Sequence, residues 1–344
     1  MSTAENNAKA SLGKHGHMEH GHMDNKHRIA VLFPGQGSQQ VGMLSELWDS
    51  YPMIEQTFTE ASDALGFDLW QVCQDDVLLA QTQYTQPALL AASMALWRII
   101  EPKLQYSPIY LLGHSLGEFS ALCASGVFSL ADAVRLVHQR GQFMASAVMG
   151  MDTKMAAILG LEDSQVANMC EQIGDMNPTA LVDPANFNSP GQVVVAGNAI
   201  GVDAVIEQTQ TCHGKKAVPL KVSVPSHCRL MTPACAKLKD KLDNIEFLPA
   251  NINVIQNRHA RVEQSTDEIK TALVEQLNHP VRWSESMQML ADMHIDVLIE
   301  CGSGNVLSNL AKRQADPIIA YPTDKISRLQ KLDEILLCVV ISLW

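Results

Sequence analysis

Residues 107–117, Ser-Pro-Ile-Tyr-Leu-Leu-Gly-His-Ser-Leu-Gly, set the architecture of this chain. The apolar run over 107–112 predicts a strand, and residues 116–125 predict a helix. Between them, Gly113-His114-Ser115-Leu116-Gly117 has the Gly-x-Ser-x-Gly pattern of a nucleophile elbow, a turn so tight that small residues must flank the serine. The helix that follows offers free N–H groups that stabilise negative charge. The pattern predicts Ser115 as a nucleophile; an ordinary strand-to-helix turn is the alternative.

Strands and helices alternate on both sides of this turn. We expect a strand over 29–33, a buried helix over 85–100 with Pro87 in its first turn, and a helix over 129–148 with Ser129 as its N-cap. Further helices are expected over 229–242 and 265–277, and a further strand over 295–300. Such alternation is typical of an α/β fold, in which crossover helices cover a parallel sheet.

Shorter units occupy residues 151–224. We expect strands over 155–159, 192–196 and 217–224, helices over 164–173 and 201–211, and a loop containing Pro178 and Pro184. This βαββαβ order predicts an inserted small subdomain of ferredoxin-like type. The remaining segments, 28–150 and 225–334, would form the large subdomain, and the apolar end at 335–344 has no assigned role.

Composition excludes several classes of protein. Of the 344 residues, 47% are hydrophobic and 18% charged, which is typical of a globular chain. The net charge of −12, without a basic run, argues against nucleic acid as a partner. No apolar stretch is long enough to cross a membrane and no secretory signal is visible, so we expect a cytoplasmic protein with reduced cysteines.

Histidine is the side chain best suited to activate a serine hydroxyl near neutral pH. Five of the twelve histidines lie in the polar segment 1–27, which we expect to be a disordered His-rich tail. Among the others, His227 and His279 each lie beside a proline at the end of a segment. Spacing alone leaves the choice between these two open.

Six motifs occur in a fixed order along the chain. They are Phe33-Pro-Gly-Gln-Gly-Ser-Gln39, Gly113-His-Ser-Leu-Gly-Glu118, Ala131-Asp-Ala-Val-Arg-Leu-Val137 with Arg140-Gly141, Asn186-Phe-Asn-Ser-Pro-Gly-Gln192, Val224-Pro-Ser-His227 and Gln276-Leu-Asn-His-Pro-Val281. Together they resemble the malonyl-CoA:acyl-carrier-protein transacylase family over about residues 28 to 325. The resemblance implies an α/β-hydrolase-like large subdomain with a ferredoxin-like insertion.

The resemblance also implies a ping-pong acyltransferase. Ser115 would attack the thioester of malonyl-CoA, His227 would act as general base and then general acid, and the Gln276 main-chain carbonyl would orient the histidine. Backbone N–H groups of Gln36 and Leu116 would form the oxyanion hole.

The substrate and partner follow from the same resemblance. Arg140 would bind the malonyl carboxylate, although periodicity alone makes Arg135 an equal candidate. The acceptor would be the phosphopantetheine thiol of an acyl carrier protein. Thioester exchange implies no metal or organic cofactor, and we expect a monomer.

Two other classes stay open at this point. A serine hydrolase or thioesterase uses the same elbow but requires an acid between Ser115 and His227 in chain order, for which Asp183 and Asp203 are available. A non-catalytic binding module is the second alternative. Within the acyltransferase interpretation, fatty-acid elongation is the natural setting, and supply of a polyketide synthase is the alternative that the sequence leaves open.

Overall fold

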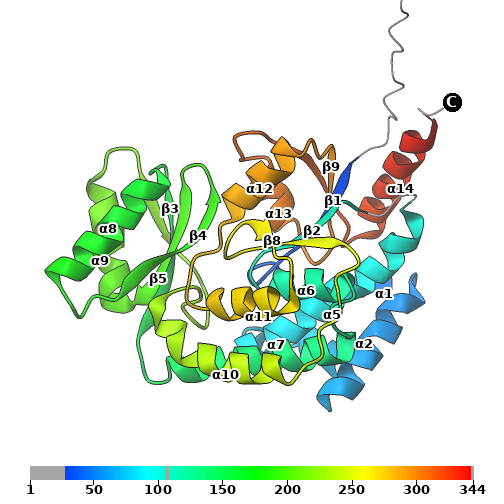
Figure 1. Cartoon of the computed structure of the whole chain (residues 1–344), viewed down its shortest axis with the longest axis horizontal. Coiled ribbons are helices and arrows are strands. Elements are labelled where there is room, and N and C mark those ends of the chain that lie inside the picture. The colour runs from blue at the N-terminus through cyan, green and yellow to red at the C-terminus, as the bar shows by residue number, and fades with distance from the viewer. Residues whose placement is uncertain (1–27, 105–107, 342–344) are drawn as a thin grey trace, which may run out of the picture.

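A computed structural model describes residues 28–104 and 108–341, and the predicted His-rich tail at 1–27 lies outside the described residues. Its larger sheet has six strands in the order β10-β9-β1-β2-β7-β8 (Figure 1). Neighbouring strands from β10 to β7 pair in parallel, and only β8 is antiparallel to its neighbour. The strands are β1 Ile29–Phe33, β2 Tyr110–Gly113, β7 Asn253–Gln256, β8 Arg261–Val262, β9 Val297–Glu300 and β10 Ile319–Pro322.

Both faces of this sheet are covered, because the central strand β1 is apolar at every position. Its residues Val31 and Phe33 face a core formed with α2, α5, α6, α7, α10 and α11, while Ala30 and Leu32 face α12 and α13. These helices are α2 Pro52–Leu65, α5 Thr82–Ile100, α6 Leu116–Ala124, α7 Leu130–Ala147, α10 Thr232–Asp243, α11 Thr266–Glu275, α12 Trp283–Asp292 and α13 Val306–Ala311. The expected α/β sheet with crossover helices is confirmed.

A second sheet is antiparallel and lies to one side of the first (Figure 1). Its order is β4-β5-β3-β6, and with α8 and α9 it has the predicted βαββαβ connectivity of a ferredoxin-like unit. The elements are β3 Thr153–Leu159, α8 Asp163–Met176, β4 Val182–Ser189, β5 Gln192–Asn198, α9 Ala199–Thr211 and β6 Lys216–Pro219. One face packs on α8 and α9, and the other, including Met155 and Val194, joins the core of the larger sheet. The boundaries at 151 and 224 stay a prediction.

Several local expectations need correction. Pro184 lies in strand β4 rather than in a loop; β4 is an edge strand with a register shift between Pro184 and Asn186, where a missing N–H is tolerated. Helix α5 begins three residues earlier than expected, so Pro87 lies inside it. The strand expected over 217–224 ends at Pro219, and the helix expected from 229 is a 3-10 turn, Arg229–Met231, followed by α10.

Short elements and the end of the chain complete the structure. Part of the apolar end at 335–344 belongs to α14 Ile326–Ile341, whose Leu329 and Leu332 are buried in the main core. The remaining elements are α1 Ser45–Trp48, α3 Leu69–Cys73, α4 Asp76–Leu79 and a 3-10 turn at Glu101–Lys103. Among the helices of the described segments, none has the length and apolar character needed to cross a membrane.

Candidate active site

The nucleophile elbow is present and its glycines are required by packing. Ser115 lies between β2 and α6 with φ 54° and ψ −109°, a conformation that costs a non-glycine residue about 1–3 kcal/mol. A Cβ on Gly113 would lie 1.8 Å from the carbonyl carbon of Gly117, and one on Gly117 would lie 1.9 Å from the Phe33 oxygen. Strand β1, the turn and α6 therefore approach more closely than any other residue type would allow.

His227 faces the nucleophile. Its Nε2 lies 2.6 Å from Ser115 Oγ, and its Nδ1 lies 2.7 Å from the main-chain oxygen of Gln276. The carbonyl only accepts, so Nδ1 carries the proton and Nε2 is free to accept the serine proton. His279 instead contacts the Glu275 carbonyl and the Asn278 amide. The structure thus separates two histidines that the sequence could not.

The His227 imidazole is uncharged at neutral pH. His227 is almost completely buried, and burial, followed by the charge of Arg140, lowers its pKa to about 3. A neutral imidazole accepts a proton at once, without first having to release one. Its main chain is also held, because its N–H donates to the Leu277 carbonyl at 3.0 Å.

Two backbone N–H groups are available beside the serine. A Cβ on Gly35 would lie 2.2 Å from the His114 oxygen, so the loop that carries Gln36 lies directly against the elbow. Leu116 is the first residue of α6, where N–H groups have no intrahelical acceptor. In the described part of the chain, neither the Gln36 nor the Leu116 N–H has a protein acceptor. Two free backbone donors beside the serine are therefore available to an oxyanion.

Arg140 is fully buried next to this centre. It donates to Gln86 Oε1 at 2.7 Å and to Gln276 Oε1 at 2.9 Å, and its Nε has no partner among the described residues. Burial lowers its pKa to about 10, so it remains a cation at neutral pH. Arg135, five residues earlier on α7, is exposed and bonds to the Ala64 carbonyl. Of these two arginines, only Arg140 contacts Gln276, whose main-chain oxygen lies at His227 Nδ1.

The two acids considered for a hydrolase triad are engaged elsewhere. Asp183 pairs with Arg229, and Asp203 pairs with Lys154 at 2.6 Å. Neither is hydrogen-bonded to His227, whose Nδ1 faces a carbonyl instead.

A cavity of about 100 Å³ opens above the serine between the two sheets. Its lining comes from the elbow, from Met155 and Asn186 of the smaller sheet, and from the segment 220–227 that connects back to the larger sheet. An acyl group would therefore be enclosed by residues of both sheets. In the described segments we find no group of three metal-ligating side chains.

Two polar residues of the site were missed by sequence analysis. Asn257, just after β7, accepts the Ser115 N–H at 2.7 Å. Glu118 is buried, accepts from the Asn257 N–H and from Gln276 Nε2, and has its pKa raised to about 7 by burial. A carboxylate in the first turn of an otherwise apolar helix was the available signal for Glu118. Asn257 follows β7, in which only Val254 and Ile255 are apolar, so the sequence did not indicate a strand there.

Comparison with known proteins places these residues in a family context. The sequence model of the acyl transferase domain matches residues 31–318. The malonyl CoA-acyl carrier protein transacylase of Escherichia coli K12 is 46% identical over 295 residues, covering 85% of this chain and 94% of that protein. The enzyme of the same name from Haemophilus influenzae is 43% identical over 312 residues, covering 90% and 99%.

Solved structures agree with the sequence matches. The crystal structure of FabD from Acinetobacter baumannii has a TM-score of 0.87 and 45% identity, covering 91% of this chain and 99% of that one. A second structure, PlMCAT:AntF, is described as a type II PKS acyl-carrier protein in complex with its malonyl-transacylase. It has a TM-score of 0.86 and 42% identity, covering 90% and 99%.

Proposed function

The chain belongs to the acyl transferase domain family, within the malonyl CoA-acyl carrier protein transacylases, and we propose that it moves malonyl from malonyl-CoA to an acyl carrier protein. The acceptor is the phosphopantetheine thiol of the carrier. One observation carries the proposal: Ser115 Oγ, His227 Nε2 and the Gln276 carbonyl form a continuous hydrogen-bonded line beside the buried cation Arg140.

The first half of the reaction acylates the serine. His227 Nε2 takes the proton of Ser115 Oγ as the oxygen attacks the thioester carbon, and the oxyanion is held by the N–H groups of Gln36 and Leu116. The carbon–sulfur bond then breaks, and His227 returns its proton to the leaving CoA sulfur. The product is a malonyl ester of Ser115 and free CoA.

The second half repeats these steps with the carrier thiol. His227 takes the thiol proton, the sulfur attacks the ester carbon, and the carbon–oxygen bond breaks as Ser115 Oγ recovers a proton from His227. We propose that no metal or organic cofactor takes part, because both half-reactions exchange one acyl bond for another and need only a nucleophile, a base and an oxyanion hole.

Malonyl selectivity is assigned to Arg140. A planar guanidinium binds a carboxylate through two parallel N–H···O bonds. Each terminal nitrogen uses one N–H on the amide oxygen of Gln86 or Gln276, which holds the group in place and leaves the second N–H of each nitrogen for a carboxylate. The unpartnered Nε offers a further donor.

The hydrolase alternative is not favoured. Asp183 and Asp203 are paired with Arg229 and Lys154, and no carboxylate is hydrogen-bonded to His227 within the described residues. Whether the malonyl carrier serves fatty-acid or polyketide synthesis stays open. The cytoplasmic location and the monomeric state also stay predictions.

The proposal is tested by mixing the chain with malonyl-CoA and holo acyl carrier protein and following the carrier and free malonate by mass spectrometry. We expect malonylated carrier with little free malonate, and no transfer with Ser115→Ala or with apo carrier, which lacks the thiol. Release of malonate with an unmodified carrier would support the hydrolase, and no reaction would contradict both.

A further inference from the structure

We propose that Asn257 is a positioning residue for Ser115, and that Glu118 couples it to Gln276, so that one buried polar unit places both the nucleophile and its base. The inference rests on the proposed function, because its effect is measured on malonylation of Ser115.

Asn257 spans the elbow from one side to the other. Its Oδ1 accepts the Ser115 N–H at 2.7 Å, and its Nδ2 donates to the Gly113 carbonyl at 2.6 Å. Its own carbonyl accepts the Arg282 N–H at 3.1 Å and its N–H donates to Glu118 Oε2, so each polar atom of the residue has a partner. Only 1% of Asn257 is exposed, and water therefore has little access to replace these bonds.

The two side-chain hydrogen bonds of Asn257, called the clamp below, act on a strained residue. Ser115 has φ 54°, a backbone conformation that an L-residue keeps only where surrounding contacts hold it. The clamp also keeps the Ser115 N–H away from the acyl group, so that the two free donors of the oxyanion hole are those of Gln36 and Leu116. Without Asn257, the elbow would lose the bond at the Ser115 N–H and the bond at the Gly113 carbonyl.

Glu118 connects the clamp to the base. Its Oε2 accepts the Asn257 N–H at 2.8 Å and Gln276 Nε2 at 2.9 Å, and Gln276 Nε2 also lies 3.1 Å from the Ser115 carbonyl. The main-chain oxygen of the same Gln276 holds His227 Nδ1. A displacement of Glu118 would therefore move the serine turn and the histidine together.

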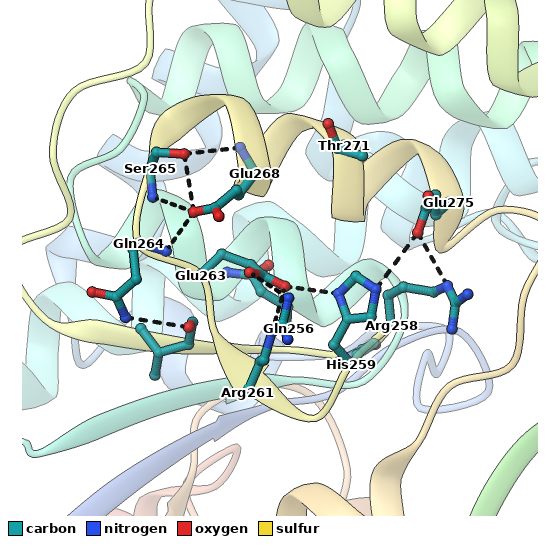
Figure 2. Close-up of polar contacts among 12 residues, drawn as sticks. Gln256, Arg258, His259, Arg261, Glu263, Gln264, Ser265, Glu268, Thr271 and Glu275 are labelled. Carbon is teal, nitrogen blue, oxygen red and sulfur yellow. Dashed lines mark hydrogen bonds and ion pairs between the residues drawn. The ribbon is translucent and has the colours of Figure 1, made fainter.

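The turn after β7 and the C-terminal end of α11 are also joined by ion pairs on their outer side. The turn after Asn257 carries Arg258 and His259, which reach Glu275, the residue before Gln276 (Figure 2). Arg258 Nε lies 3.2 Å from Glu275 Oε2, and His259 Nδ1 lies 2.7 Å from Glu263 Oε1. The two contacts to Glu275 join the turn to the end of α11, whereas the inner contacts are made by Asn257 and Gln276.

The test compares Asn257→Ala with a matched control, Ser125→Ala. Ser125 is also buried and bonds to the Ile252 carbonyl and N–H, but it lies at the opposite end of α6, about 15 Å along the helix from Ser115. Both variants remove hydrogen bonds between α6 and the segment around β7, and only one of them touches the elbow.

We expect Asn257→Ala to slow malonylation of Ser115 by about 10²-fold, because a misplacement near 1 Å has an effect of this size. The KM for malonyl-CoA should stay within about threefold, since the binding contacts are kept. Ser125→Ala should keep both constants. Rapid-quench intact-mass measurement gives the rate, and circular dichroism with thermal melting confirms that each variant folds.

A second pair of variants tests the coupling. Glu118→Gln keeps an acceptor oxygen for both Asn257 and Gln276, whereas Glu118→Ala keeps none. We expect Glu118→Gln to restore most of the kcat that Glu118→Ala loses. Should Asn257→Ala not fold, Asn257→Leu has a similar branched shape, makes neither side-chain bond, and takes its place.

The outcomes are distinct. An Asn257→Ala rate equal to that of the wild type, or a Ser125→Ala loss of the same size, would overturn the inference, as would equal kcat values for the two Glu118 variants. If the wild-type chain itself is not malonylated, the proposed function fails, which is a different result.

Discussion

Replacing Arg140 with alanine should reduce acylation by malonyl-CoA far more than acylation by acetyl-CoA. The guanidinium is fully buried, so its removal deprives the substrate carboxylate of its charge partner at a site that bulk water does not reach. A hydrogen bond to a charged group contributes about 1.5–3 kcal/mol, and two of them about 3–6 kcal/mol. At about 1.4 kcal/mol per tenfold change in rate, the malonyl-specific loss is about 10²- to 10⁴-fold.

Arg140→Ala should also lower the acylation rate with both CoA esters, and this loss must be separated from the malonyl-specific one. Arg140 also donates to Gln276 Oε1 at 2.9 Å, and the main-chain oxygen of Gln276 orients His227. Loss of that bond should slow both donors equally, by about 10-fold. Acetyl-CoA lacks the free carboxylate, so the ratio of the two losses isolates recognition of malonyl.

The assay is the rate of Ser115 acylation by each CoA ester, followed by intact mass after rapid quenching. Arg135→Ala is the matched control, because Arg135 lies on the same helix but is exposed and points to Ala64 and Asp132. It should change neither rate by more than about threefold. Equal losses for the two esters in Arg140→Ala would refute the assigned role, whatever their size.

Three further predictions concern the base, the acids and the elbow. Because the pKa of His227 is lowered to about 3, its imidazole stays neutral as the pH falls through 6.5, where an ordinary histidine would be half protonated. The pKa of Glu118 is raised to about 7, so the pH profile is measured in Glu118→Gln, which removes that titration. Malonylation by this variant should hold its rate through pH 6.5, and a halving there, measured by rapid quenching, would contradict a neutral His227. Asp183→Asn and Asp203→Asn should keep the rate of transfer to the carrier within about threefold, because surface ion pairs contribute little and neither acid contacts His227. A loss of about 10³-fold or more in either variant would support the hydrolase triad instead. Gly117→Ala should lower the melting temperature strongly or prevent folding, because the new Cβ would lie 1.9 Å from the Phe33 oxygen. A melting temperature equal to that of the wild type would show that β1 and α6 can move apart at Gly117.

The sequence predicted the parts of the fold that are encoded locally. The elbow follows from glycine spacing between an apolar strand and a helix, and Ser129 caps α7 by accepting the Asp132 N–H at 3.1 Å, as expected. Five of the six elements of the smaller subdomain also follow from local patterns, and the exception is β4, which contains Pro184. By contrast, β7 and β10 were not predicted, because β7 has only two apolar residues, Val254 and Ile255, and β10 contains Pro322.

The site could be predicted from local pattern only in part. The choice of His227 over His279 depends on packing across 112 positions of sequence, and that of Arg140 over Arg135 depends on which face of α7 lies inward. The family resemblance pointed to both. Asn257 and Glu118 act through contacts over 142 and 158 positions, and only Glu118 had a local signal, as a carboxylate in the first turn of an apolar helix.

The central claim is that Ser115 carries the malonyl group between donor and acceptor. Its most direct test is the intact mass of the chain mixed with malonyl-CoA alone, followed by peptide mapping and then by addition of holo acyl carrier protein. We predict one malonyl adduct on the peptide containing Ser115, absent in Ser115→Ala, that disappears as the carrier gains the same mass. Transfer to the carrier by Ser115→Ala, or an adduct on another residue, would contradict the account.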